Sequence, residues 1–384
     1  MITKLESRRF RCLADVRQAL RPFQMLVGPN ASGKSAFMDV LAFLRTLVSQ
    51  NLEAAVAERT ENFHDLVWGR ELSSFELAVE ATIPEDRRVP LDGTKSETVR
   101  YEVSARIDPR KDEVVIGQES VLLRGAGGQH ERAVAKRDKR AEFSNEPGDG
   151  KSSFEIPSRS SALSQVPMDS AFPATAWLRD LLREGVWTVA LRPEQLRAPS
   201  PPHPKAAALG GSYLARFAAQ LSDDSPQLFQ DWTAHVRTEL RDLETIKTVL
   251  RPEDRHRYLM LRYQNGVEVP SWVVSDGTLR LLALTVLAYM PNAAGVYLIE
   301  EPEDGLHPSA IETVHQSLSS FYDGQVLVAT HSPVLVSLAE LRDILCFSKT
   351  PEGTRTIAGD AHPALRDWKG EVNLSELFAA GVLD

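Results

Sequence analysis

The segment that most constrains the fold is the run from Gly28 to Ser35, which reads GPNASGKS and matches G-x-x-x-x-G-K-[ST]. It follows the apolar stretch Phe23–Val27, which is typical of a buried strand. Behind it, apolar residues recur at helical spacing from Phe37 to Val48. A strand, a glycine loop and a helix in this order build a phosphate site, because backbone N–H groups and the helix N-terminus then face the anion. The sequence therefore predicts a nucleotide-binding α/β fold.

We expect the whole run to contact nucleotide, with separate roles for its last two residues. Lys34 is expected to place its charge on the phosphates, and the Ser35 hydroxyl to bind Mg²⁺. A chance glycine turn is the alternative, and the flanking strand and helix patterns argue against it. The expected nucleotide-binding residues are Gly28, Pro29, Asn30, Ala31, Ser32, Gly33, Lys34 and Ser35.

Two more apolar stretches end in polar residues suited to phosphate chemistry. Val296–Ile299 runs into Glu300 and Glu301, and Val326–Ala329 is followed closely by His331. The carboxyl ends of parallel strands share one sheet edge, so these side chains are expected to converge. Glu300 would hold the metal, directly or through water. Glu301 would orient and deprotonate the attacking water, and His331 would hydrogen-bond the γ-phosphate or that water. The alternatives are a solvent-exposed acidic strand end and a histidine that is only packed.

A second phosphate contact is predicted where Ser275, Asp276 and Gly277 open a helical pattern that runs to about Tyr289. The simpler interpretation is a helix cap, with Ser275 as the N-cap and Asp276 favouring the positive helix end. The same geometry could also offer an anion site to the γ-phosphate of a second subunit. The two interpretations are compatible.

Together, these motifs resemble those of the ABC-type ATPases, in the group that contains RecF, Rad50 and SMC heads, and more closely the small stand-alone AAA_21 ATPases. The resemblance implies an ATPase that uses ATP and Mg²⁺ and forms a head-to-tail homodimer around two nucleotides. The segments that carry it are Gly28–Ser35 (Walker A), Leu196–Arg197, Ser275–Gly277 (signature), Val296–Glu301 (Walker B), Glu303–Pro308 (D-loop), Thr330–Ser332 (switch histidine) and Asn373–Phe378.

Some positions depart from that pattern. Glu300 stands where Walker B usually has Asp, and the signature has Asp276 and Thr278. No clear Q-loop glutamine is present, and His64 and Asp65 are the polar candidates for its place. Lys34 and Ser275 lie 241 positions apart (275 − 34), farther than in transporter ATPases, yet without coiled-coil heptads between them. This spacing favours a compact, RecF-like protein. About 53 residues follow His331 (384 − 331), which we expect to leave no room for a TOPRIM nuclease domain.

The residues between the phosphate loop and the later motifs show different sequence patterns. Alternating patterns at 75–83 and 99–107 predict half-buried antiparallel strands, and Val114–Leu123 is expected to form a third strand. Residues 125–170 suggest a flexible loop, and helical patterning predicts helix from Tyr213 to about Leu250. A hairpin is expected around Asn265–Gly266. The predicted fold is therefore an α/β P-loop NTPase of the ABC-head type, with a doubly wound, mostly parallel sheet. Its expected domains are an ATPase core (1–75 with 255–384), an antiparallel β subdomain (76–124) and an inserted flexible loop and helical lobe (125–254).

The composition of the chain bears on which partners, DNA or membrane, the protein is expected to bind. The chain has 44 Lys+Arg against 53 Asp+Glu, a formal net charge of −9, which argues against general coating of DNA. Only Cys12 and Cys346 are present, and no long apolar run appears, so a soluble cytoplasmic protein with no membrane partner is expected. A local cluster, Arg132, Lys136, Arg137, Lys139 and Arg140, is either a solvated loop or a contact with nucleic acid or a partner.

The expected function is an ATP-driven switch in DNA repair or anti-phage defence, working with an effector protein encoded nearby. The alternative is an ATP-gated scaffold or regulator of a toxin or nuclease subunit that does not touch DNA. A transporter energy subunit is disfavoured by the spacing.

Overall fold

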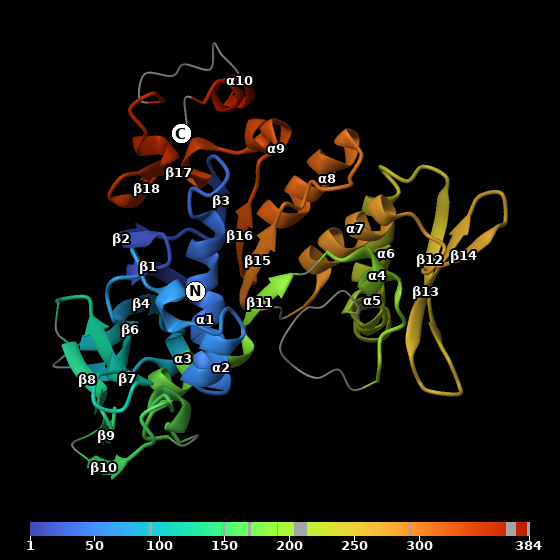
Figure 1. Cartoon of the computed structure of the whole chain (residues 1–384). Coiled ribbons are helices and arrows are strands. Elements are labelled where there is room, and N and C mark those ends of the chain that lie inside the picture. The colour runs from blue at the N-terminus through green and yellow to red at the C-terminus, as the bar shows by residue number, and fades with distance from the viewer. Residues whose placement is uncertain are drawn as a thin grey trace. The chain divides into compact units, whose positions relative to one another are not determined.

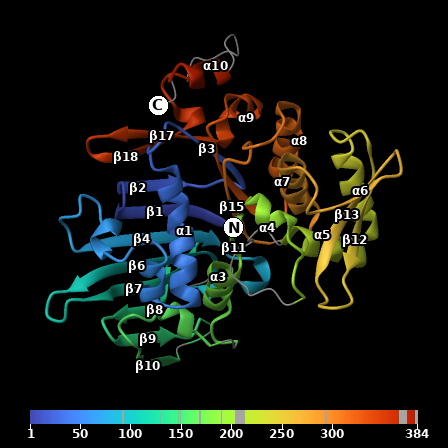
Figure 2. The same cartoon turned by 45° about the vertical axis from the view of Figure 1, so that its right-hand side comes forward.

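The structure is a computed structural model that describes residues 1–91, 94–128, 130–146, 148, 150–167, 170–189, 191–202, 213–291, 294–365 and 374–381. Its residues form two compact units, and Figures 1 and 2 show the elements of both. Unit 1 contains Met1–Arg21, Pro29–Val186 and Phe347–Ile357, and unit 2 contains Pro22–Gly28, Trp187–Cys346 and Ala358–Asp384. The three-part domain division drawn from the sequence stays a prediction.

Unit 1 is built on a nine-stranded antiparallel sheet with the order β10-β9-β8-β7-β6-β4-β1-β2, and β5 pairs with β6. The three predicted strands are confirmed as β4, β6 and β7, which pair antiparallel as β4–β6 and β6–β7. The strands are β1 (Ile2–Phe10), β2 (Leu13–Ala19), β4 (Ser74–Thr82), β5 (Pro90–Leu91), β6 (Thr94–Asp108), β7 (Glu113–Gly125), β8 (His130–Arg137), β9 (Arg140–Ser144) and β10 (Lys151–Glu155).

Helix α1 (Lys34–Ser49) packs across this sheet, as Figure 2 shows. The ring of Phe43 lies 5.6 Å from that of Phe10 on β1 and 5.5 Å from that of Phe75 on β4, both in edge-to-face geometry. α1 also packs against α2 (Leu52–Ala57) and α3 (Pro173–Glu184). The helix predicted behind the glycine loop is thus confirmed, and aromatic contacts fix it to the sheet.

The predicted loop at 125–170 is wrong for much of its length, because β8, β9 and β10 occupy it. Val134, Ala141 and Phe143 are buried in the sheet, but polar residues around them mask the strand pattern. Lys136 is buried as well, and its Nζ donates to the carbonyls of Pro157 (3.2 Å) and Ser160 (2.5 Å). The basic cluster therefore lies on a hairpin, and one of its members is not on the surface.

Unit 2 is centred on a parallel sheet. Its strand order is β11-β15-β16-β3-β17-β18, and the outer part of the β17–β18 hairpin, Phe347–Ile357, belongs to unit 1. The predicted strands are confirmed at β3, β15 and β16. The pairs β15–β16, β16–β3 and β3–β17 are parallel. The strands are β3 (Phe23–Val27), β11 (Val186–Val189), β15 (Val296–Glu300), β16 (Gln325–Ala329), β17 (Ile344–Thr350) and β18 (Gly353–Ala358).

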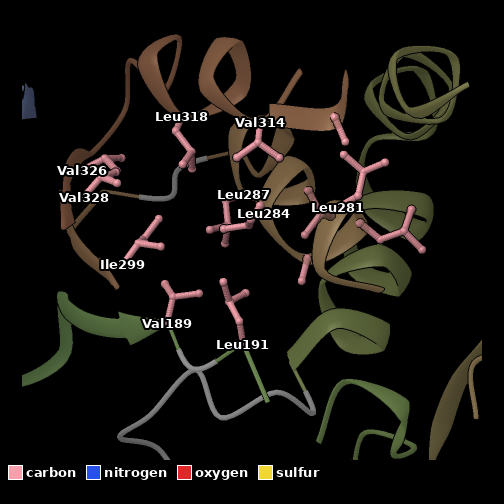
Figure 3. Packing of buried hydrophobic residues seen from close by; sticks show 14 of the residues in the cluster. Val189, Leu191, Leu281, Leu284, Leu287, Ile299, Val314, Leu318, Val326 and Val328 are labelled. Atoms are coloured by element: carbon pink, nitrogen blue, oxygen red, sulfur yellow. The ribbon is translucent and has the colours of Figure 1, made fainter. Parts of the chain in front are cut away.

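Helices α7 (Asp276–Thr285) and α8 (Pro308–Ser319) pack against each other and enclose the core of unit 2. Figure 3 shows Leu281 and Leu284 of α7 near Val314 and Leu318 of α8, with Ile299 of β15 and Val326 and Val328 of β16 close by. This apolar layer holds the strand ends of the parallel sheet in place. The other helices of unit 2 are α4 (Pro193–Arg197), α5 (Tyr213–Asp224), α6 (Pro226–Val236), α9 (Pro333–Leu338) and α10 (Leu374–Ala379).

The helical patterning predicted from Tyr213 to about Leu250 is confirmed only as far as Val236, where it forms the two helices α5 and α6, and the end of that range is a strand instead. β12 (Leu243–Leu250) carries β-branched residues and pairs with β13 (Arg257–Tyr263), which pairs with β14 (Glu268–Pro270). The predicted hairpin at Asn265–Gly266 is confirmed, and Gly266 has the left-handed φ of 82° that this turn needs. Along the described residues, no helix has the length and apolarity to cross a membrane.

Candidate functional site

The phosphate loop bends through three left-handed residues, Gly28 (φ 143°), Ala31 (φ 60°) and Gly33 (φ 108°). Gly33 is the N-cap of α1. A Cβ added there would come within 2.4 Å of Thr354 Oγ1, so backbone strain and close contact both require glycine. The loop thereby begins the first long helix of unit 1 with its backbone sharply curved.

Two side chains, those of Lys34 and Thr354, hold the curved backbone of the phosphate loop. The buried Lys34 reaches back over the loop, and its Nζ donates to the carbonyl of Pro29 at 3.0 Å. Thr354 Oγ1 donates to the carbonyl of Ser32 at 2.9 Å, and Ser35 and Asn30 are exposed. A curved backbone, a helix N-terminus and a lysine fit the phosphates of a nucleotide. Sequence reasoning missed Thr354, because 322 residues separate it from Ser32 and only the β17–β18 hairpin brings it to the loop.

Strand register in unit 2 places a second group of candidate residues. Glu300 of β15 pairs with Ala329 of β16, and Ala329 pairs with Leu26 of β3. Because these strands are parallel and end at the same level, the residues that follow them leave from one sheet edge. Gly28 follows β3 directly at that edge. From Pro29 onward the phosphate loop belongs to unit 1, while Glu300, Glu301, His331 and Ser275–Gly277 belong to unit 2.

Glu301 and His331 lie next to each other in unit 2. Glu301 has φ 47°, and its N–H donates to the carbonyl of Ala329 at 2.8 Å, which turns the chain sharply after β15. Glu301 Oε1 is 3.9 Å from His331 Nε2, and the side chains are 49% and 34% exposed. Partial burial, together with the negative charges of Asp304, Glu303 and Glu300, raises the pKa of Glu301. A carboxylate with a raised pKa beside an imidazole is suited to taking a proton from water.

Glu303 joins the two strand ends. Its Oε1 accepts a hydrogen bond from Thr330 Oγ1 at 2.5 Å and one from the N–H of His331 at 3.1 Å. The Thr330 hydroxyl also accepts from the N–H of Ser332 at 2.9 Å. Sequence reasoning placed Glu303 in the D-loop resemblance but gave it no role. The signal that could have found it is a third carboxylate in the turn directly after a strand that ends in two.

The predicted cap at the start of α7 is confirmed. Ser275 Oγ accepts a hydrogen bond from the N–H of Thr278 at 3.3 Å and donates to Thr278 Oγ1 at 2.9 Å. Asp276 forms an ion pair with Arg197 of α4, and Arg197 also donates to the carbonyl of Val274 at 3.1 Å. Contact of Ser275–Gly277 with a second subunit's nucleotide stays a prediction.

The start of α7 also touches the turn after β15. A Cβ on Gly277 would come within 2.7 Å of the carbonyl oxygen of Gly305, so these two glycines allow close approach. Arg280 donates to the carbonyl of Asp304 at 2.6 Å. The signature-like segment and the D-loop-like segment of one chain are therefore in direct contact within unit 2.

The Q-loop candidates lie in a 3₁₀ helix, Phe63–Leu66, in unit 1. Asp65 accepts a hydrogen bond from the Thr60 hydroxyl at 2.7 Å and pairs with Arg70 at 3.0 Å. These contacts give Asp65 a local structural role, and a nucleotide contact by His64 or Asp65 stays a prediction. The closing segment 373–378 begins α10 at Leu374, and Asn373 lies outside the described residues.

Known structures share the fold. A crystal structure of an SMC head bound to the C-winged-helix domain of ScpA aligns with a TM-score of 0.58 and 16% identity, covering 93% of this chain and 96% of that one. An SMC head with an extended coiled coil, bound to the C-terminal domain of ScpA derived from Pyrococcus furiosus, aligns with a TM-score of 0.50, 16% identity, and 93% and 95% coverage. No curated protein matches the chain.

A family model matches residues 23–337, which is most of the chain and includes every motif from β3 to the switch histidine. Its description is "AAA domain, putative AbiEii toxin, Type IV TA system". With the phosphate loop and the parallel sheet, this match agrees with the resemblance drawn from the motifs. The chain belongs to the AAA_21 family of ATP-binding P-loop ATPases and has the fold of an SMC head.

Proposed function

We propose that this protein hydrolyses ATP and works as a molecular switch, with two copies closing head to tail around two Mg-ATP molecules. The observation that carries the proposal is the register of β15, β16 and β3. It sends Glu301, His331 and the start of the phosphate loop from one edge of the parallel sheet. Glu301 also has the raised pKa and the imidazole neighbour that suit a general base.

Each element has a task in this proposal. Lys34 and the curved backbone bind the phosphates, and Ser35 and Glu300 hold Mg²⁺, which supplies charge neutralisation on the phosphate oxygens when bound. Glu301 takes the proton of the attacking water, and His331 orients that water or the γ-phosphate. Three features of the phosphate loop fit such a ligand: its residues with positive φ, Gly33, where a Cβ would clash with Thr354, and the buried Lys34.

The signature-like segment would complete the site of the other copy. Ser275, Asp276 and Gly277 lie at the N-terminus of the ten-residue helix α7, where the helix dipole favours an anion. Asp276 would repel a phosphate if it stood alone, but its ion pair with Arg197 reduces that charge. Binding energy at the γ-phosphate would hold the dimer closed, and hydrolysis would release it.

Glu301→Gln tests the switch. This variant keeps size and shape but removes the base, so we expect ATP to trap a stable dimer, seen by size-exclusion chromatography with light scattering. Glu312→Gln on the exposed face of α8 is the matched control and should behave like the wild type. A Glu301→Gln protein that stays monomeric with saturating Mg-ATP contradicts the proposal.

For the target of the switch, we propose DNA-related work in repair or anti-phage defence, in the cytoplasm and with an effector partner. The β8–β9 hairpin is the candidate contact, because Arg132, Arg137, Lys139 and Arg140 are exposed. Arg140 also lies 3.6 Å from Glu142, so part of this charge is balanced locally. Alanine at these four positions should abolish a salt-dependent gel shift with duplex DNA. The absence of any wild-type shift at low salt, with and without ATP, would exclude direct DNA binding.

The second candidate is an ATP-gated scaffold or regulator of a toxin or nuclease subunit that does not bind DNA. The family description names a toxin system, and the related SMC heads are bound to a protein partner, ScpA. The buried Lys136 also removes one charge from the predicted DNA contact. Co-purification of a protein encoded next to this chain, retained on the ATP-trapped Glu301→Gln dimer without DNA, would favour this candidate.

A further inference from the structure

The two carboxylate oxygens of Glu303 lie in unlike surroundings. Oε1 accepts two hydrogen bonds, from Thr330 Oγ1 and from the N–H of His331. Oε2 is buried, and no partner for it is found among the residues that the structure describes. A buried carboxylate oxygen without a donor lowers stability, so a purely structural anchor is a poor explanation for an acid at this position.

The bonds on Oε1 act on the backbone that carries His331. The Thr330 hydroxyl donates a hydrogen bond to Glu303, while its oxygen accepts one from the N–H of Ser332 at 2.9 Å. Thr330 and His331 thus bond to the carboxylate directly, and Ser332 is linked to it through the Thr330 hydroxyl. Ser332 in turn caps α9 by accepting a hydrogen bond from the N–H of Leu335 at 3.3 Å. These hydrogen bonds therefore connect Glu303 to the start of the next helix.

The same carboxylate is fixed relative to Glu301. The turn after β15 is closed by two backbone hydrogen bonds, from Asp304 N–H to the Glu301 carbonyl (3.1 Å) and from Leu306 N–H to the Glu303 carbonyl (3.0 Å). Glu303 therefore stands on a hydrogen-bonded turn that begins with Glu301. Its side chain connects this turn to Thr330 and to the backbone of His331.

We propose that Glu303 is a positioning residue that fixes the His331 imidazole against Glu301, and so accelerates hydrolysis without contacting the nucleotide. The proposal rests on the function proposed above, because it needs Glu301 and His331 to act together. An ionised carboxylate suits the task, since charge-assisted hydrogen bonds are shorter and stronger than neutral ones. A glutamine would keep the acceptor oxygen but lose the charge.

A double-mutant cycle on ATP turnover tests this directly. We expect Glu303→Ala to lower kcat on the order of 10²-fold, with little change in KM, because small displacements of reacting groups carry a cost of that size. In the His331→Ala background, the same substitution should have almost no further effect. Losses that simply multiply would overturn the proposal, because Glu303 would then act independently of His331.

Substitutions from the other side of the bond provide matched controls. Thr330→Val removes the hydroxyl that Glu303 accepts from and should reproduce the kcat loss of Glu303→Ala. Thr330→Ser keeps the hydroxyl and should stay close to the wild type. Glu303→Gln should fall between the wild type and Glu303→Ala. If Thr330→Val and Thr330→Ser have equal activity, the hydrogen bond is not what positions His331.

A readout without nucleotide separates this proposal from the proposed function. In histidine-labelled protein, the NMR signal that disappears in His331→Ala identifies His331. That signal should shift in Glu303→Ala and in Thr330→Val, but not in the surface control Glu312→Gln. A wild type without ATP hydrolysis would contradict the proposed function while leaving this shift in place. An unchanged His331 signal in both variants overturns the positioning role, whatever the ATPase rate.

Discussion

The two sheets of the molecule bury their strands in different ways. In the parallel sheet of unit 2, all five residues of β16 and all five of β3 are buried, so consecutive side chains on both faces lie in the core. In the antiparallel sheet of unit 1, burial alternates along strands such as β7. A strand buried on both faces can expose functional groups only at its ends. The candidate catalytic residues therefore lie at the strand ends of unit 2.

In unit 1, the buried carboxylate of Glu119 accepts hydrogen bonds on both of its oxygens. Glu119 of β7 accepts hydrogen bonds from the hydroxyls of Tyr101 (2.9 Å) and Ser161 (2.5 Å) and from the N–H of Ala162 (2.7 Å). Within the described residues, every donor to this buried carboxylate lies in unit 1. Glu303 in unit 2 has one satisfied oxygen and one without a partner in the described chain. The comparison separates a carboxylate that anchors a loop from one that we propose positions His331.

The largest expected effect concerns burial in the two sheets. Leu327→Ala and its neighbour Val328→Ala should both destabilise unit 2, by about 2–5 and about 2 kcal/mol, because both side chains are fully buried. In unit 1, Leu77→Ala should cost a similar amount, but its exposed neighbour Glu76→Ala only about 0.5 kcal/mol or less. Urea unfolding measures all four. If Glu76→Ala and Leu77→Ala destabilised the protein equally, the contrast between alternating burial in unit 1 and two-sided burial in unit 2 would be wrong.

A smaller effect is expected from an ion pair between strands of unit 1. Arg100 donates to both carboxylate oxygens of Glu6, at 3.1 and 2.7 Å, and this bond lowers the pKa of Glu6 to about 2. A lowered folded-state pKa stabilises the protein above the unfolded-state value of 4.5, and this stability is lost as the pH falls from there toward 2. Allowing for partial exposure, Glu6→Gln should cost about 2 kcal/mol at pH 7.

The pH dependence supplies the control for that prediction. The difference between wild type and Glu6→Gln in urea unfolding should shrink steadily from pH 5 to pH 2, since the wild-type carboxylate becomes protonated there. A difference that stays constant over this range would show that packing, not charge, explains the loss.

The smallest expected effects distinguish neighbours on the β8–β9 hairpin. Lys136→Ala should lower the free energy of unfolding by about 1–2 kcal/mol, because two carbonyls lose their buried donor. Arg137→Ala is exposed and should change stability by less than about 0.5 kcal/mol. Thermal unfolding of the pair measures both. If Arg137→Ala is the more destabilising, Lys136 is a surface residue and the basic cluster should be restored to five members.

Sequence reasoning identified the parts of the fold whose signals are local. Continuous apolar runs located β3, β15 and β16, and the glycine pattern located the phosphate loop. It failed where contacts between residues far apart in the sequence determine the secondary structure or the partner of a side chain. β8, β9 and β10 pair as strands although their sequences are largely polar, and Leu243–Leu250 is a strand because β13 lies beside it. Thr354 lies far along the chain from Ser32, to which it donates, so no local pattern could assign it. Arg197 is part of the family resemblance, but its ion pair with the distant Asp276 could not be predicted from the sequence.

The central claim is that the strand-end carboxylate Glu301 takes a proton during ATP hydrolysis. The most direct measurement is the single-turnover rate of γ-phosphate release from ATP by wild type, Glu301→Gln and the surface control Glu312→Gln, with nucleotide affinity measured in parallel. We expect wild type and Glu312→Gln to hydrolyse ATP at the same rate, and Glu301→Gln to be at least about 10²-fold slower with unchanged ATP affinity. Equal rates for Glu301→Gln and wild type would contradict the claim.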